Sequence, residues 1–418
     1  MIRKVLYAVL VSVLIAGCSS PVEKRNRESD RYSFAASMLD YYFLFREKLP
    51  ENLYAFLDPE ALYFSVDEPF TVYYPPEIGA GFLGSLTTAT SGAGMKVFAV
   101  SSGYVVENVY PDAPAEECGL KVGDTITHVD GNPAAGVSEA RFSEMLSGYI
   151  GETAGLTLKR GSDVLTKTLT FAIYSEPSVF FEYIDSSTAY IQITNFFDET
   201  STPGGTEVEF ASALDSTSDA ENLILDLRNN GGGYIAQCLN VVSYLVEPGT
   251  DVINTFERHA DDEYVMEDSI TYTTESGGGA SDRKLFVLMN EWTASASEIL
   301  IACVKSARSD VVAFGTHTYG KARGQVYAVG PDSCVAKVTC QIFWPVSGAH
   351  YDLTGIKPDV AVGSEDALNS AYVYISGSEL AKSASAGKIQ NINEAYRTSF
   401  DSDRWKPLAV EKHLSLEK

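Results

Sequence analysis

The sequence predicts a mixed α/β protein of several domains, and three observations carry that prediction. Its 418 residues exceed what one ordinary hydrophobic core holds, so two or three domains are expected. Strands and helices alternate from residue 189 onward, which is typical of an α/β layer architecture. A β-rich block precedes that region, and a helical segment at residues 30–76 precedes the block.

Composition excludes several classes of partner and cofactor. The formal charge of -25, from 31 basic and 56 acidic residues, argues against nucleic acid, because phosphate binding needs a basic surface. Beyond residue 18 five cysteines remain without CxxC spacing, which predicts neither a zinc site nor a disulfide framework. Cys334 and Cys340 would lie about 20 Å apart on one strand and could not bridge. We expect buried, reduced thiols, no metal and no cofactor.

The N-terminal sequence predicts that the protein is located in the cell envelope. Residues 1–17 carry two basic residues and then an apolar run, Val5–Ala16, that is shorter than the ~20 residues needed to cross a bilayer. A cleaved signal peptide fits better than an anchor helix. The ending "IAGC" resembles a bacterial lipobox, which would make Cys18 the lipidated first residue of the mature chain. Residues 18–29 would then be a flexible, lipid-anchored tether, on the periplasmic or outer-membrane side of a bacterial membrane.

Two further segments precede the α/β region. Residues 30–76 have apolar residues at helical spacing, interrupted by prolines, which predicts two or three short helices with aromatic inner faces. Residues 105–131 give a strand, a Pro-rich turn, a short helix ended by Gly119, and a strand running into Asp-Gly. This pattern resembles a PDZ domain, which we place at residues 77–172.

The resemblance to PDZ domains implies a peptide-binding function. These domains bind peptide C-termini by strand addition, and a glycine-containing loop captures the carboxylate. The stretch "EIGAGF" is the nearest candidate for that loop, although it matches the pattern weakly. The candidate substrate-binding residues are therefore Gly79, Ala80, Gly81 and Phe82.

Three loops in the α/β region follow consecutive predicted strands, at the carboxyl edge where open α/β sheets place their sites. They span residues 228–233 ("RNNGGG"), 293–298 ("TASASE") and 319–325 ("YGKARGQ"). Neither a G-x-G-x-x-G fingerprint nor a P-loop is present, so a nucleotide site is not expected. Asp226 and Arg228, beside the first loop, are expected to form a structural pair.

Four motifs together resemble the C-terminal processing (tail-specific) peptidases. They are "DLRNNGGG" (226–233), "TASASEI" (293–299), "GKARGQ" (320–325) and "GIKPD" (355–359), and the resemblance spans about residues 77–360. It implies a crotonase-like α/β catalytic domain at 173–376, downstream of the PDZ domain, with a C-terminal tail at 377–418. The helical N-terminal segment resembles that of Bacteroides-type lipoprotein members. The chain departs from the family pattern at Thr293 and Gly231, and in a spacing about one residue longer between serine and lysine.

Carried over by position, the family roles fall on a small set of residues. Ser295 would be the nucleophile, Lys321 the general base and Gln325 the residue that orients the lysine. The backbone N–H groups of Ala296 and Gly232 would form the oxyanion hole. The resemblance also implies protein or peptide substrates with free C-termini.

The chemistry of this set is consistent on physical grounds. A serine hydroxyl is a poor nucleophile until a base takes its proton. A lysine can do so only when neutral, so its pKa must fall from ~10.4 by about three units, roughly 4 kcal/mol. A neutral glutamine suits this purpose, because a carboxylate would raise that pKa again.

Three alternatives stay open at this level. Ser295 and Glu298 fit the S-x-x-E capping box, so Ser295 could serve only as a helix cap. A Ser–His–Asp triad would have to use His317 or His350, and the G-x-S-x-G elbow of α/β-hydrolases is missing. The protein could also be a catalytically inactive, PDZ-type peptide-binding lipoprotein.

Overall fold

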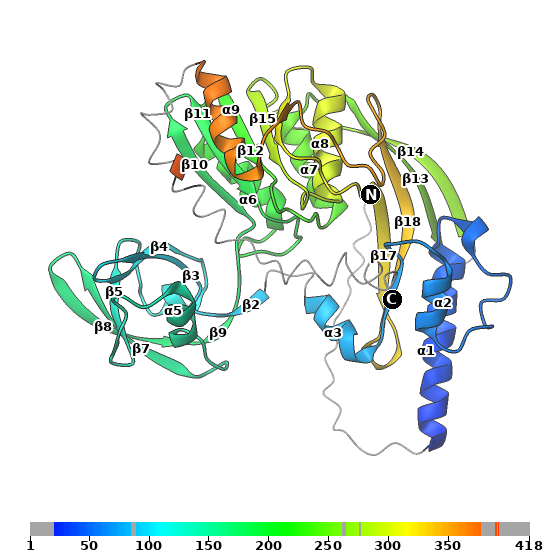
Figure 1. The fold of residues 1–418 in the computed structure, drawn as a ribbon, viewed down its shortest axis with the longest axis horizontal. Coiled ribbons are helices and arrows are strands. Elements are labelled where there is room, and N and C mark those ends of the chain that lie inside the picture. The colour runs from blue at the N-terminus through cyan, green and yellow to red at the C-terminus, as the bar shows by residue number, and fades with distance from the viewer. Residues whose placement is uncertain are drawn as a thin grey trace.

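The N-terminal segment forms helices that pack on a sheet of the α/β region. The computed structural model describes residues 21–84, 89–260, 265–275, 277–377, 389–390 and 392 (Figure 1). The segment consists of α1 (Pro21–Tyr42), the 3-10 turn η1 (Arg46–Lys48), α2 (Pro59–Ser65), β1 (Val72–Tyr74) and α3 (Pro76–Gly84). Helix α2 begins where the sequence predicts a start, because the Asp58 side chain accepts the Ala61 N–H at 2.8 Å and proline occupies the first helical position.

The PDZ domain follows as a separate sheet with its own core. Its strands are ordered β3-β4-β5-β7-β8, with β6 added to β5, and the short pair β2 and β9 forms the two links to the rest of the chain. Tyr104 and Phe142 stack in its core. The elements are β2 (Ala89–Gly92), β3 (Met95–Val100), β4 (Gly103–Val109), α4 (Pro114–Glu117), β5 (Thr125–Val129), β6 (Asn132–Pro133), α5 (Glu139–Met145), β7 (Thr153–Arg160), β8 (Asp163–Thr170) and β9 (Ala172–Ser175).

The α/β region supplies the remaining elements, and the strands and helices expected from residue 189 onward are confirmed. The elements are β10 (Val179–Asp185), β11 (Thr188–Ile193), α6 (Gly205–Ser216), β12 (Asn222–Asp226), α7 (Ile235–Leu245), β13 (Asp251–Ala260), β14 (Val265–Thr273), β15 (Lys284–Met289), α8 (Ala296–Ala307), β16 (Val312–Gly315), β17 (Arg323–Val329), η2 (Pro331–Ser333), β18 (Val335–Pro345), β19 (Val360–Ala361), η3 (Ser364–Asp366) and α9 (Ala367–Ser376).

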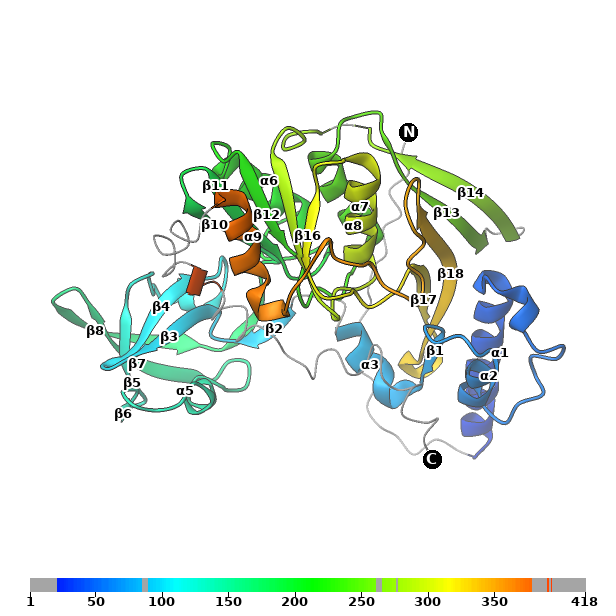
Figure 2. The same cartoon turned by 45° about the horizontal axis from the view of Figure 1, so that its top comes forward.

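Helix α8 lies between two sheets, as Figure 2 shows. The first sheet is ordered β10-β11-β12-β15-β16-β19 and is parallel from β11 to β19. Helix α9 covers one face of this sheet, while α6, α7 and α8 cover the other. Strand β12 is buried at all five positions, as expected for a parallel strand covered on both faces.

The second sheet lies beyond α8 and joins segments that are distant in sequence. Its order is β1-β18-β13-β14, and β17 pairs with β18 as well. Strand β1 pairs antiparallel with β18, although the PDZ domain and most of the α/β region lie between these two strands in the sequence. One face of β18 packs on α1 and α2 through Ala336 and Val338, and the preceding Cys334 joins the same core. The N-terminal helices therefore share a core with the second sheet and form no separate helical domain.

Two expectations for the first 90 residues are wrong. Residues 21–29, expected as a tether, belong to α1, and their glutamates, lysine and arginines are good helix formers. Residues 77–82, expected as the carboxylate-binding loop, lie in helix α3 on the second sheet. A side chain at Gly79 would meet the carbonyl oxygen of Ser333 at 2.2 Å, so this glycine permits close helix packing instead. The PDZ sheet itself begins only at Met95.

Other expectations fall partly or wholly outside what the structure describes. The signal peptide, Cys18 and most of the tail lie outside the described residues. Within those residues the five cysteines are free thiols, of which all but the half-buried Cys118 are buried. None of the helices in the described ranges is both long and apolar enough to cross a bilayer.

Candidate active site

The three loops singled out from the sequence converge at the carboxyl edge of the first sheet. They follow β12, β15 and β16, which are neighbours in that sheet. Asn230 in the first loop accepts the Ala294 N–H and the Ser297 hydroxyl through its carbonyl oxygen, both at 3.0 Å. The N–H of Tyr319 in the third loop donates to the Thr293 carbonyl at 3.0 Å. Hydrogen bonds therefore bind the first and third loops to the second, which carries Ser295.

Ser295 has a backbone conformation that a simple helix cap does not need. It precedes α8 with φ 57° and ψ −119°, whereas N-cap residues ordinarily lie in the extended region. A positive φ at a non-glycine residue costs about 1–3 kcal/mol, and such strain persists where the surroundings hold it, commonly at functional sites. The side chain is partly exposed, between the buried Ala294 and Ala296. The conformation favours a nucleophile at this turn over a helix cap.

Glu298 connects the serine turn to the lysine loop. Its Oε2 accepts the backbone N–H of Ser295 at 3.0 Å and that of Lys321 at 2.7 Å. Its Oε1 accepts the N–H of Gly320 at 2.7 Å and the hydroxyl of Thr318. The carboxylate is fully buried, and burial raises its pKa while these donors oppose that rise. The capping-box geometry predicted for Glu298 is thus present, and the same side chain also holds the third loop.

Lys321 and Gln325 make the contact that the family resemblance implies. The Lys321 ammonium donates to Gln325 Oε1 at 2.8 Å, and Gln325 Nε2 donates to the carbonyl of Phe70 at 2.8 Å. A bulge between Gly324 and Gln325 interrupts the β17–β18 register. It brings Gln325 closer to Lys321 than a fully extended chain would allow. Desolvation lowers the pKa of Lys321 to about 8, although the charges of Glu68 and Glu298 oppose this shift. A neutral amine is therefore accessible near physiological pH.

The N-terminal segment supplies one wall of this site. The ring of Phe70 lies 5.4 Å from Lys321 Nζ. Glu68 is fully buried and accepts hydrogen bonds from Arg323 at 2.8 Å and from the Thr339 hydroxyl at 2.9 Å. Arg323 also forms an ion pair with Asp352 at 2.7 Å. Nothing in the sequence pattern of residues 66–71 indicated this role, because the contacts span about 255 residues of chain.

The two predicted oxyanion donors differ in whether their N–H groups already have an acceptor in the structure. Ala296 is the first residue of α8, so its N–H has no acceptor within the helix and remains available. The N–H of Gly232 instead donates to Asn230 Oδ1 at 2.9 Å, so its availability as an oxyanion donor is not borne out here. Gly232 lies against the serine turn at φ +102°, and a Cβ there would meet Ser295 Cβ at 2.8 Å. In the structure, the missing side chain of Gly232 lets the first loop pack closely against the turn of Ser295.

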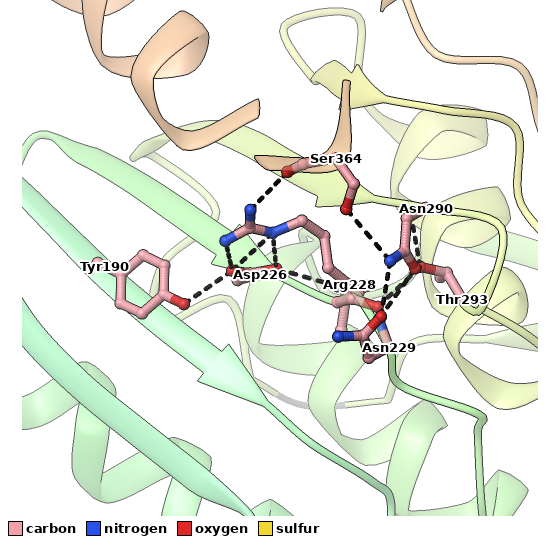
Figure 3. A network of polar contacts seen from close by, with 8 residues as sticks. Tyr190, Asp226, Arg228, Asn229, Asn290, Thr293 and Ser364 are labelled. Atoms are coloured by element: carbon pink, nitrogen blue, oxygen red, sulfur yellow. Dashed lines mark hydrogen bonds and ion pairs between the residues drawn. The ribbon is translucent and has the colours of Figure 1, made fainter. Parts of the chain in front are cut away.

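A buried polar network behind the site fixes the ends of β12 and β15 (Figure 3). Arg228 forms a buried ion pair with Asp226, whose carboxylate also accepts the Tyr190 hydroxyl at 2.7 Å. Asn290 accepts the Asn229 N–H at 2.9 Å. Figure 3 shows this network extending to Ser364 of η3, which precedes α9. Asp226 and Arg228 are a structural pair, as expected.

The histidine alternative gains no support from the geometry. His317 and His350 are both exposed. In the described part of the chain, no hydrogen bond joins the Ser295 hydroxyl to either ring or to the Lys321 amine, and His350 Nδ1 accepts the Asp352 N–H at 3.2 Å. Across the same residues no cluster of three potential metal ligands is found.

Sequence reasoning missed a second buried lysine beside the site. Lys337 on β18 is 5% exposed, and its ammonium lies 5.6 Å from the ring centres of Tyr74 and of Phe82. Desolvation, together with the charge of Lys321, lowers its pKa to about 7, and the charge of Glu68 opposes this shift. The sequence of β18 gave one signal of this site. The first six positions of the strand are buried, yet two of them carry the polar residues Lys337 and Thr339 instead of apolar ones.

This fold and this site define the class of protein. Residues 187–362 match the model of peptidase family S41, and residues 82–170 match that of a PDZ domain. Residues 187–362 therefore form a domain of peptidase family S41, and the PDZ domain precedes it in the sequence.

Individual relatives agree with this assignment. The carboxy-terminal processing protease CtpA of Bacillus subtilis (strain 168) is 26% identical over 315 residues, 74% of this chain and 64% of the relative. The chloroplastic C-terminal processing peptidase of Tetradesmus obliquus is 27% identical over 319 residues, 72% of this chain and 66% of the relative. The chain thus spans just under two thirds of these two relatives.

A solved structure shares the fold. A protein from Bacteroides fragilis NCTC 9343, assigned to the S41 proteases, superimposes with a TM-score of 0.55 at 20% identity. The match covers 82% of this chain and 97% of that one.

Proposed function

We propose that this protein is a serine endopeptidase with a Ser–Lys dyad that cleaves protein substrates near their C-termini. One observation supports this most strongly. The loop of Lys321, whose amine has a lowered pKa and an amide orienter, is hydrogen-bonded through Glu298 to the turn of Ser295. The match of residues 187–362 to peptidase family S41 supports this reaction class, and these contacts are consistent with its chemistry.

In the proposed reaction, neutral Lys321 takes the proton of the Ser295 hydroxyl as Oγ attacks the scissile carbonyl carbon. The carbonyl π-electrons move to the oxygen, and the Ala296 N–H, at the positive end of α8, stabilises that oxyanion. Collapse breaks the C–N bond, and the Lys321 ammonium gives its proton to the leaving amine. Water then attacks the acyl-enzyme by the same route, releasing the new C-terminus and restoring Ser295.

The PDZ domain would hold the tail of the substrate. Strand β3 is the edge of the PDZ sheet, because it pairs only with β4 among the described strands. The turn Gly92–Gly94 leads directly into β3, and Ala93, Met95 and Val97 pack partly exposed on the PDZ core. An added peptide strand would find backbone groups along this edge and apolar contacts beside it. We therefore move the proposed tail-binding site from residues 79–82 to β3 and the turn before it.

Lipid anchoring through Cys18 remains part of the proposal. The lipobox-like ending of the N-terminal apolar run supports it, and it would place the enzyme in the cell envelope, attached to a bacterial membrane. Globomycin treatment tests this directly. A protein whose mass and membrane fraction are unchanged by the drug, or by Cys18→Ala, would not be a lipoprotein.

Cleavage of an unfolded C-terminal tail tests the enzymatic proposal. A folded reporter with a flexible apolar tail should be shortened by the wild type, while Ser295→Ala and Lys321→Ala should each lose at least about 10³-fold in rate. His317→Ala should retain activity. Loss in His317→Ala with activity retained in Lys321→Ala would instead assign the reaction to a histidine triad.

Binding measured separately from cleavage tests the tail site. Ser295→Ala should bind a fluorescent peptide with a free C-terminus more tightly than the same peptide amidated. Equal affinity for the two would contradict carboxylate capture. Tail binding by a wild-type protein that never labels with a fluorophosphonate at Ser295 would favour a catalytically inactive peptide-binding lipoprotein.

A further inference from the structure

The turn before β3 presents backbone N–H groups, because its carbonyl groups already have donors. The Ala93 carbonyl accepts the N–H of Ala115 at 2.8 Å. The Gly94 carbonyl accepts the N–H of Tyr110 at 3.0 Å. Among the described residues, neither Ala93 nor Gly94 donates its own N–H to a backbone carbonyl. These N–H groups are therefore available to an anionic ligand on the other side of the turn.

Tyr174 lies against this turn, on the strand by which the chain leaves the PDZ domain. Strand β9 pairs antiparallel with β2, the strand that leads into the turn, at the place where the PDZ sheet joins the rest of the chain (Figure 1). A Cβ at Gly92 would lie 3.8 Å from the Tyr174 ring and 3.9 Å from its hydroxyl oxygen. Burial raises the pKa of this phenol, and the nearby Gly94 N–H opposes the rise. The Tyr174 hydroxyl therefore lies beside the N–H groups of the proposed tail site.

The Tyr174 hydroxyl already binds a carboxylate of its own chain. It donates to Glu176 Oε1 at 3.3 Å, and both side chains are partly exposed. The ring of Tyr110 packs beside that of Tyr174, with 6.1 Å between the ring centres. A phenol has a single proton, so it can donate to only one carboxylate at a time, and two carboxylates beside it would repel each other. A substrate carboxylate bound at this turn would therefore compete with Glu176.

We propose that Tyr174 is a further carboxylate-binding residue of the tail site, and that Glu176 accepts its hydroxyl until the C-terminus of a substrate tail replaces it. The tail carboxylate then accepts the Tyr174 hydroxyl together with the N–H groups of the turn, while the rest of the tail pairs with β3. This inference rests on the proposed function and adds two residues to the tail site, both outside the sheet that contains β3.

The backbone is fixed on both sides of Glu176, so the exchange needs only a side-chain rotation. Strand β9 ends at Ser175, one residue before it. The N–H groups of Ser178 and Val179, just after it, donate to the buried Glu209 carboxylate of α6 at 2.7 and 3.1 Å. Rotation of a partly exposed side chain is fast and costs little. Glu176 can therefore leave the tyrosine while the two domains keep their connection.

Peptide binding to the Ser295→Ala protein tests this inference. The probes are a fluorescein-labelled peptide with an apolar, free C-terminus and the same peptide amidated. Tyr174→Phe keeps the ring and removes the donor, so it should weaken binding of the free peptide about tenfold and leave that of the amidated one unchanged. Glu176→Gln removes the competing charge, so it should tighten binding of the free peptide about threefold or more. Asp163→Asn, which removes an exposed carboxylate of β8, should change neither affinity.

A double variant shows whether the two carboxylates compete for one hydroxyl. The gain from Glu176→Gln should shrink in a Tyr174→Phe background, because the contested donor is then missing. A gain of the same size in both backgrounds would overturn the inference and leave only charge repulsion. Weaker binding of the free peptide by Glu176→Gln would overturn it too, since the contact would then support the turn. Equal losses for both peptides in Tyr174→Phe would assign the hydroxyl a packing role instead.

The same measurements separate this inference from the proposed function. Both expected shifts in affinity, in a protein whose wild type cleaves no tail, would support the inference and reject the peptidase proposal. Unchanged affinities in Tyr174→Phe and Glu176→Gln, in an enzyme that cleaves tails and prefers the free peptide, would reject this inference alone. Equal affinity of the Ser295→Ala protein for the two peptides would reject carboxylate capture at this turn, and this inference with it.

Discussion

Ser295 and Lys321 donate their backbone N–H groups to the same oxygen of Glu298, at 3.0 and 2.7 Å. One buried side chain therefore sets the positions of the proposed nucleophile and the proposed base relative to each other. The Glu298 carboxylate accepts further hydrogen bonds from Gly320 and Thr318 through its other oxygen. An amide has a single acceptor oxygen, so a glutamine at this position could not accept all four of these hydrogen bonds.

The first prediction concerns Glu298→Gln. Its amide NH₂ would face backbone donors, so we expect a loss of about 1–3 kcal/mol in the free energy of unfolding and at least a hundredfold fall in kcat/KM. Thermal melts and tail-cleavage kinetics measure the two effects. Glu291→Gln is the matched control, because Glu291 is exposed and, among the described residues, accepts a single hydrogen bond, from the Thr316 hydroxyl. Full activity in Glu298→Gln would show that another contact positions the two loops.

The second prediction concerns the amide that orients Lys321. In Gln325→Glu a carboxylate would replace the neutral acceptor 2.8 Å from the ammonium and stabilise its charge. The pKa of Lys321, now about 8, should rise by one to three units, and the acid limb of kcat/KM should move up equally. Gln325→Ala should lower the rate without that alkaline shift. Identical pH profiles for the two variants would exclude electrostatic tuning through residue 325.

The third prediction concerns the close approach of Gly232 to the serine turn. Gly232→Ala adds a Cβ only 2.8 Å from Ser295 Cβ and 2.9 Å from the Ala296 nitrogen, at φ +102°. We expect activity to fall by at least a hundredfold, because Ser295 and the Ala296 N–H, the proposed oxyanion donor, must both shift. Gly249→Ala has a φ of +79° with no atom within 4 Å, so it carries the backbone strain alone. Equal activity in the two variants would contradict this interpretation.

The fourth prediction concerns stability and Lys337. The folded protein holds this proton with a pKa of about 7, whereas the unfolded chain holds it near 10.5. The resulting penalty is fully present below about pH 7 and disappears as the pH rises toward 10.5. Lys337→Met should therefore exceed the wild type in free energy of unfolding at pH 7, and this advantage should shrink toward pH 9.5. Comparing two proteins with the same thiols and tyrosines cancels the titration of those groups. A constant difference across the range would contradict the prediction.

The sequence predicted the catalytic strands and loops well, for a local reason. Parallel strands such as β12 and β15 are short apolar runs, and the loops after them must meet at one edge of the sheet. Ser295, Lys321 and Gln325 could be placed because their motifs are contiguous. The Lys321–Gln325 contact needed one feature that the sequence only hinted at, namely the bulge after Gly324.

Contacts between distant segments could not be predicted. Phe70 and Glu68 reach the site because β1 pairs with β18, and no periodicity signals a pairing across an inserted domain. The pattern "GAG" occurs twice, at residues 79–81 and 92–94, and composition alone did not separate a helix glycine from a turn glycine. Lys337 was passed over because an alternating strand normally presents its lysines to water. Here that face points to the active site.

The pairing of β1 with β18 also bears on how the protein can be shortened. Phe70 accepts the amide of Gln325, and its ring covers the Lys321 amine. A fragment that starts at the PDZ domain would keep every residue of the catalytic motifs, yet it would open the lysine to water and restore its ordinary basicity. The leading helices and strand thus supply part of the proposed active site, and trimming them as a spacer would leave the sheet around a solvated, charged amine.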